Sequence, residues 1–104
     1  MLTRAALPPK PVSSTESYII DFVDALTAGS TISTQSVTAS VYSGTDASPS
    51  AIISGSASAS GTKVTQKITA GTVGVIYQLT WSVTTSDSLT LKKLGFLAIV
   101  PDLV

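Results

Sequence analysis

The stretch that decides the fold runs from Ile68 to Asp87 and reads ITAGTVGVIYQLTWSVTTSD. From Val75 onward its residues fall into two alternating sets: Val75, Tyr77, Leu79, Trp81 and Val83 at odd positions, and Ile76, Gln78, Thr80, Ser82 and Thr84 at even ones. A pleated strand points successive side chains to opposite faces, so this period of two indicates a half-buried strand. The sequence therefore predicts a central strand with Trp81 in the core.

A glycine-containing turn at residues 70–74 precedes this strand, and Tyr77 follows the turn closely. Gly71 and Gly74 can adopt a positive φ without a Cβ clash. This order resembles the tyrosine corner of immunoglobulin-like sandwiches, in which the phenol reaches back to an upstream main-chain group. We therefore expect the Tyr77 hydroxyl to donate a hydrogen bond to a main-chain carbonyl in or before the turn.

Turn signals recur along the chain at short intervals, and the segments between them are rich in β-branched residues. This pattern predicts an all-β fold, an immunoglobulin-like antiparallel β-sandwich of about seven strands, with a meander in a small open barrel as the alternative. A single helical turn is expected at residues 23–29. A bend is expected near Thr34–Ser36, and a bulge at Lys92–Lys93 that puts Leu94, Phe96, Ala98 and Val100 on one face. The other expected strands cover residues 17–22, 31–42, 51–60, 63–68 and 89–100.

Residues 1–15 are predicted to form an extended, Pro-rich N-terminal arm, and residues 16–104 the sandwich domain. Pro8, Pro9 and Pro11 fix φ and disfavour helix. The arm lacks alternating apolar positions, so we expect it to lie outside the sandwich and to be held by another subunit. Docking on its own domain is the alternative.

Composition limits what the protein can do. The 104 residues are 43% hydrophobic and only 12% charged, which is typical of one folded domain. Six basic and six acidic residues leave no net charge, so no nucleic-acid or membrane partner is expected. Cysteine and histidine are both absent, and we predict no catalytic, cofactor-binding or metal-binding residues and no cofactor. No apolar run is long enough for a signal-peptide core or a membrane span, so synthesis in the cytoplasm is expected.

Two residue pairs could carry a function. Asp21 and Asp24 form a close carboxylate pair, but acid–base chemistry would require a pocket and a perturbing neighbour, so strand-end or capping roles are favoured. Trp81 and Tyr42 could stack on a sugar ring, yet Trp81 shares the phase of the core residues. The serines have no histidine to activate them, so the protein is not expected to be an enzyme.

Several short motifs, taken in order, resemble one family. They are Lys10-Pro11, Asp21-Phe22, Leu26 to Ile32, Ser54-Gly55, the turn Ala70 to Gly74, Tyr77 to Thr80, and Thr84-Thr85-Ser86. This series is similar to that of the small immunoglobulin-like virion proteins of tailed bacteriophages called fiber-tail adaptors. The chain departs from the pattern at Phe22, Ala70 and Asp87-Ser88, where Trp, Gly and Gly-Arg are usual.

The resemblance implies a non-enzymatic bacteriophage structural protein that joins the head, neck or tail to fibers. It also implies a location in the virion after synthesis in the host cytoplasm. The implied partners are other virion structural proteins, namely portal or neck, tail, capsid or fiber subunits, with several copies or a homo-oligomer in the particle. The alternatives are a capsid decoration protein and a carbohydrate- or surface-binding β-sandwich module.

Overall fold

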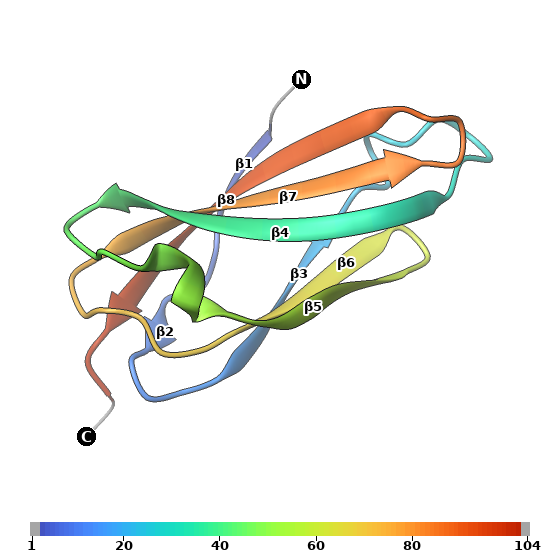
Figure 1. The fold of residues 1–104 in the computed structure, drawn as a ribbon. Helices are drawn as coiled ribbons and strands as arrows, with labels where there is room; N and C mark the ends of the chain where they lie inside the picture. The colour runs from blue at the N-terminus through green and yellow to red at the C-terminus, as the bar shows by residue number, and fades with distance from the viewer. Residues whose placement is uncertain (1–2, 103–104) are drawn as a thin grey trace.

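The computed structural model describes the backbone of residues 3–102 and the side chains from residue 7 onward. Two β-sheets face each other across a single core (Figure 1). Among residues 3–102, no helix is long and apolar enough to cross a membrane. The elements are β1 (Thr3–Ala6), β2 (Lys10–Pro11), β3 (Glu16–Asp21), β4 (Ile32–Ser43), the 3-10 turn η1 (Pro49–Ile52), β5 (Ile53–Ser60), β6 (Lys63–Ile68), β7 (Ile76–Thr85) and β8 (Thr90–Val100).

The strand order is that of an immunoglobulin-like sandwich. One sheet runs β1-β8-β7-β4 with β2 also on β8, and the other runs β3-β6-β5. The second to fourth strands of an immunoglobulin domain are likewise divided between the two sheets, and its last two strands pair with the third. The all-β sandwich prediction is confirmed.

The central strand prediction is also confirmed. In β7, Tyr77, Leu79 and Trp81 are fully buried and Val83 is nearly so, while the even-numbered residues between them are only partly covered. The second sheet supplies the facing side chains: Tyr18, Ile20 and Phe22 from the β3 segment and Val64 and Ile68 from β6. Alternation in each strand therefore directs one face into a shared core.

The last strand differs from the prediction. β7 and β8 pair without interruption from Ile76↔Ala98 to Thr84↔Thr90, so there is no bulge at Lys92–Lys93. Consequently the odd-numbered residues from Lys93 to Ile99 are buried. The set Leu94, Phe96, Ala98 and Val100 lies on the outer face, and Lys93 takes an inward position. The inward-facing lysine interrupts the apolar pattern, which is why the sequence suggests an extra residue.

Two smaller predictions have different outcomes. The irregularity expected at residues 34–36 occurs slightly earlier, as a register shift between Ile32 and Thr34. The single helical turn expected at residues 23–29 forms at its start, where the amides of Ala25 and Leu26 both donate to the Phe22 carbonyl and the Leu26 bond has the i→i−4 spacing of an α-helix.

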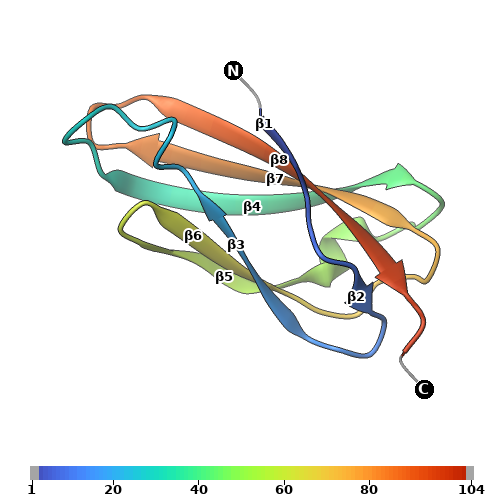
Figure 2. The ribbon, with the colours of Figure 1, turned by 180° about the vertical axis from the view of Figure 1, so that it is seen from behind.

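The N-terminal arm is extended, as predicted, but it does not lie outside the sandwich. β1 and β2 pair in parallel with β8, as seen from behind in Figure 2. Leu7 follows β1 and packs over Gly95, where an added Cβ would lie 3.1 Å from the leucine Cδ1 and 3.4 Å from Trp81 Nε1. The expectation that the arm lacks strand-forming positions is wrong, because β8 supplies the hydrogen-bonding partner that the arm's own sequence does not reveal.

A chain lacking residues 1–15 tests the boundary at residue 15, which stays a prediction. We expect its melting temperature to fall well below that of the full chain, because truncation removes Leu7 from the core and uncovers the edge of β8. Thermal denaturation followed by circular dichroism measures this. Equal melting temperatures would show that residues 16–104 are an independent domain.

Candidate functional site

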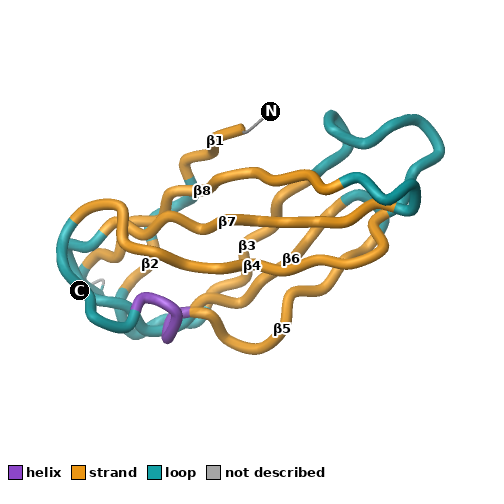
Figure 3. Tube along the Cα trace, turned by 45° about the horizontal axis from the view of Figure 1, so that its top comes forward, coloured by secondary structure: helices purple, strands orange, loops and turns teal. Residues whose placement is uncertain are grey.

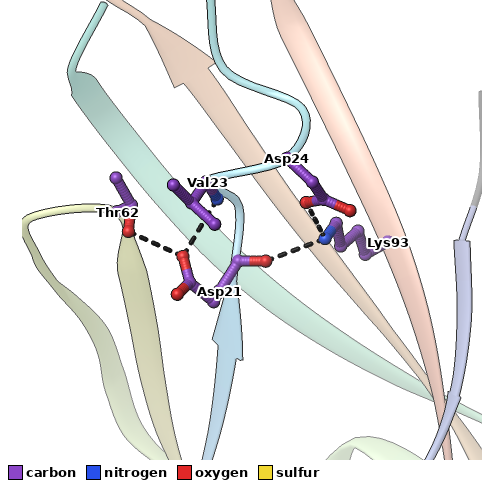
Figure 4. Close-up of polar contacts among 5 residues, drawn as sticks. All are labelled: Asp21, Val23, Asp24, Thr62 and Lys93. Carbon is purple, nitrogen blue, oxygen red and sulfur yellow. Dashed lines mark hydrogen bonds and ion pairs between the residues drawn. The ribbon is translucent and has the colours of Figure 1, made fainter.

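A cluster of polar side chains ties the loop after β3 to β8 and β6 (Figure 4). Lys93 Nζ lies 2.5 Å from Asp24 Oδ1 and donates to the Asp21 carbonyl oxygen at 2.8 Å. The Asp21 carboxylate instead accepts from the Val23 amide at 2.9 Å and from the Thr62 hydroxyl at 2.6 Å. The amine also lies 5.4 Å from the centre of the Phe22 ring, a cation–π distance.

This geometry does not suit acid–base catalysis by Asp21 and Asp24. The Thr62 hydroxyl holds the pKa of Asp21 below its ordinary value, and the Lys93 amine does the same for Asp24. Both carboxylates are therefore ionised at neutral pH, and neither is poised to donate a proton. A covalent amide cross-link between Lys93 and Asp24 would require the side chain of Asp24 to be a neutral carboxylic acid. The ion pair with Lys93 stabilises the ionised carboxylate instead. The cluster acts as a strand-end cap and a link between the two sheets.

The Lys93 side chain is mostly covered, with 11% of its surface exposed, whereas the Asp24 side chain is 65% exposed. The pair therefore joins a covered cation to a carboxylate that remains in contact with water. Such a cation needs hydrogen-bond acceptors, and the loop of residues 21–24 provides them. Sequence reasoning missed Lys93 because it assigned the Lys92–Lys93 pair to a bulge, which put Leu94 and not Lys93 on the inward face.

Lys10 is the second residue that sequence reasoning missed. Its side chain is fully buried, and its amine donates to the carbonyls of Pro11, Val12 and Ser14 at 2.7, 3.2 and 2.6 Å. Burial lowers the pKa of this amine. Lys10 thus fixes the turn between the arm and β3, and the Ser13 amide and hydroxyl strengthen the closure by donating to the Asp102 carboxylate.

The Tyr77 hydroxyl contacts the turn, but there it accepts a hydrogen bond and does not donate one as predicted. It accepts this bond from the Thr72 amide at 3.0 Å and donates its own proton to Asp46 Oδ2 at 2.6 Å. The predicted donation to a main-chain carbonyl is therefore wrong. The carboxylate from the β4–β5 connection provides a stronger, charge-assisted acceptor, and no sequence pattern places Asp46 there.

The two aromatic residues considered for sugar stacking are not brought together. Trp81 has no exposed surface and packs in the core, as predicted. Its Nε1 has no hydrogen-bond partner among the described residues. Tyr42 is 57% exposed on the outer face, with its ring centre 4.6 Å from that of Phe96 and the rings tilted by 55°.

The described residues contain no group of three or more acidic side chains that could hold a metal ion.

Ser30 and Thr85 both donate to the Asp87 carboxylate, and the Ser86 amide donates to the Thr31 carbonyl, so the two neighbouring loops at one end of the sandwich are fastened together. Figure 3 shows these loops at one end and the β4–β5 connection at the other. The polar contacts are thus concentrated where strands end.

These contacts and the strand order define a small structural β-sandwich whose buried polar groups serve its own fold. No curated protein and no solved structure matches the chain. A family profile does match, over residues 10–94, and it is described as podophage GP4 fiber-tail adaptor protein gp77. The chain belongs to this fiber-tail adaptor family, as the sequence motifs predict.

Replacing Tyr77 with Phe removes both the hydrogen bond from the Thr72 amide and the charge-assisted one to Asp46, and should lower the free energy of unfolding by about 2 kcal/mol. Denaturant unfolding of Tyr77→Phe and of the wild type measures the difference. Tyr42→Phe is the matched control, since its exposed hydroxyl should leave stability unchanged. Equal stability of Tyr77→Phe and the wild type would contradict a structural role for the corner.

The Asp24–Lys93 pair should make stability sensitive to acid. The folded-state pKa of Asp24 lies below its unfolded value, so the pair stabilises the fold above about pH 4 and loses this effect as the pH falls through the lowered folded value. We expect the difference in melting temperature between wild type and Asp24→Asn to be constant from neutral pH to about pH 5 and to shrink below about pH 4.

The pairing can be isolated with a double-mutant cycle. In a Lys93→Met background, Asp24→Asn should have little further effect on stability at neutral pH, because the partner charge is already gone. Additive effects of the two substitutions would show that the pair does not stabilise the fold.

Proposed function

We propose that this protein is a non-enzymatic structural component of a bacteriophage virion and that it joins the head, neck or tail to fibers. Membership of the fiber-tail adaptor family, over residues 10–94, is the observation that carries this proposal. The protein is made in the host cytoplasm and resides in the finished particle.

The chemistry of the described residues supports a role without catalysis. The chain has no histidine or cysteine, and the Asp21, Asp24 and Asp46 carboxylates have pKa values that are lowered by their hydrogen bonds. The covered amines of Lys10 and Lys93 are occupied by main-chain carbonyls or a carboxylate. These groups hold the fold together and leave no activated nucleophile.

The surface supports contact with other proteins. Several large apolar side chains remain exposed, and they lie on strands and loops outside the arm: Ile19, Val23, Tyr42, Val73 and Leu89. The partners are other virion structural proteins, and several copies in one particle would allow individually weak contacts to add. The contacts of residues 7–14 with their own domain favour these exposed side chains, and not the arm, as the docking elements.

Particles assembled without this protein test the proposal. We expect such particles to have heads but no attached fibers, and addition of the purified, folded chain to restore fibers seen by electron microscopy. Heat-unfolded chain is the control and should restore nothing. Fibers attached without the protein, or absence of the protein from purified wild-type virions by mass spectrometry, would contradict the adaptor role.

A further inference from the structure

The two sheets have four free edges, and three of them carry features that obstruct a further strand. Pro8, Pro9 and Pro11 lie along the arm edge beside β8. β3 has acidic residues, Glu16 and Asp21, at its two ends. Proline, charge and irregular backbone are the usual means by which proteins prevent strands of other chains from pairing with an edge.

The β5 edge is obstructed by a bulge. Its pairing with β6 shifts register between Ser54 and Ser58, and Gly55 has a φ of 73°. The buried Gln66 amide holds this shape by donating to the carbonyls of Ser54 and Gly55 at 3.1 and 3.2 Å. Figure 3 shows the resulting curve of β5 away from a straight strand path.

β4 has none of these features. Its twelve residues, ISTQSVTASVYS, include no charge, proline or glycine. The two register shifts lie near its ends, and from Thr34 to Val41 it pairs with β7 without interruption. Within residues 3–102, β7 is the one strand with which it pairs. β5 passes nearby on the inner side, where the Gln35 side-chain amide donates to the Ala57 carbonyl at 3.2 Å.

An antiparallel edge leaves half of its backbone groups unpaired. Every second residue directs its N–H and C=O to β7, and the residues between direct theirs away from the sheet. Over eight regular residues this edge is about 27 Å long. Ser36, Thr38 and Ser40 on its outer face are exposed, so no side chain of the same domain covers them. Water can satisfy such a row of groups, but the row is also a template on which another extended strand can pair.

We propose that the β4 edge pairs in antiparallel fashion with the β4 edge of a second copy of this chain. Two identical edges related by a two-fold axis pair residue i of one copy with residue j of the other and j with i, so side chains near the axis meet their own counterparts and a single charge there would meet a like charge. β4 has no charge to repel a second copy. This favours a second copy over a partner recognised by charge.

The pleat limits the register of this pairing. Opposed residues in an antiparallel pair lie on the same face, so even-numbered residues of one copy face even-numbered residues of the other. The outer face then has Ser36, Thr38 and Ser40 against the same set in the second copy. Such Ser and Thr pairs are compatible with cross-strand hydrogen bonding. The inference does not depend on the proposed function, since it concerns the purified chain alone.

Sedimentation velocity of the purified full-length chain over a range of concentrations tests the pairing. We expect a concentration-dependent dimer. In Thr38→Lys combined with Ser40→Lys, two positive charges on each copy would face those of the other, and the dissociation constant should rise by about tenfold or more.

Thr80→Lys is the matched control. Thr80 lies opposite Thr38 on the same outer face, but in β7 and away from the edge, so this variant should still dimerise. A control that disrupts the dimer as strongly would show packing between sheet faces and overturn edge pairing. A wild-type chain that remains monomeric at every concentration would also overturn it and leave β4 to a strand of a different protein.

Hydrogen exchange of the wild type gives a second measurement that does not depend on any variant folding. The edge-directed main-chain amides, those of every second residue from 34 to 41, should exchange more slowly as the protein concentration rises, while those of the β5 edge should not change. Protection that is independent of concentration at residues 34–41 would contradict the proposal.

Discussion

The inward face of β7 is the constraint on which the rest of the structure depends. Trp81, Tyr77 and Leu79 have no exposed surface, and they occupy the space between the two sheets. Burial of three large side chains on one strand requires a complete second layer opposite, which β3 and β6 provide through Phe22, Val64 and Ile68. It also requires a cover at the sheet edge, and Leu7 provides this over Gly95 beside the indole. The N-terminal arm is therefore part of the core's enclosure.

Polar groups complete the enclosure at the ends of the sandwich. The amine of Lys93 closes one end against the loop after β3, and that of Lys10 closes the turn before β3 by bonding three carbonyls. A covered ammonium group is costly unless it is hydrogen-bonded, so each lysine fixes the loop that surrounds it. At the end of the sandwich opposite Lys93, the hydrogen bond from the Tyr77 hydroxyl to the Asp46 carboxylate fastens the β4–β5 connection. The loops are positioned by these few contacts because the core itself contacts them little.

In this adaptor-family protein, the groups that stabilise the fold are different from the groups that remain on the surface. The buried face and the covered lysines hold the single domain together, while the uncharged edge of β4 and the exposed apolar side chains are the surfaces we propose for contacts with other chains. Weak contacts of this type become effective when many copies are arranged in one particle. A chain without net charge also avoids mutual repulsion in such an arrangement.

The local order of residues was sufficient for the main features of the fold. Period-two alternation in residues 75–84 and 63–68 depends only on the pleat and on which side chains avoid water, so both strands and the burial of Trp81 could be predicted. The motif order likewise predicted the fiber-tail adaptor family. These conclusions need no knowledge of what each strand lies against.

The tertiary structure alone decided the roles of Lys10, Lys93, Asp46 and the arm. An isolated lysine is typical of a wet surface, and only the carbonyls and carboxylate brought near by the fold make its burial favourable. The bulge expected at Lys92–Lys93 was wrong for this reason. The apolar residues of the arm do not alternate, so its place was decided by the unpaired backbone edge of β8, a feature created about 90 residues later in the chain. Hydrogen bonding between distant backbone segments leaves no periodic signal in side-chain chemistry, and therefore only the folded chain reveals it.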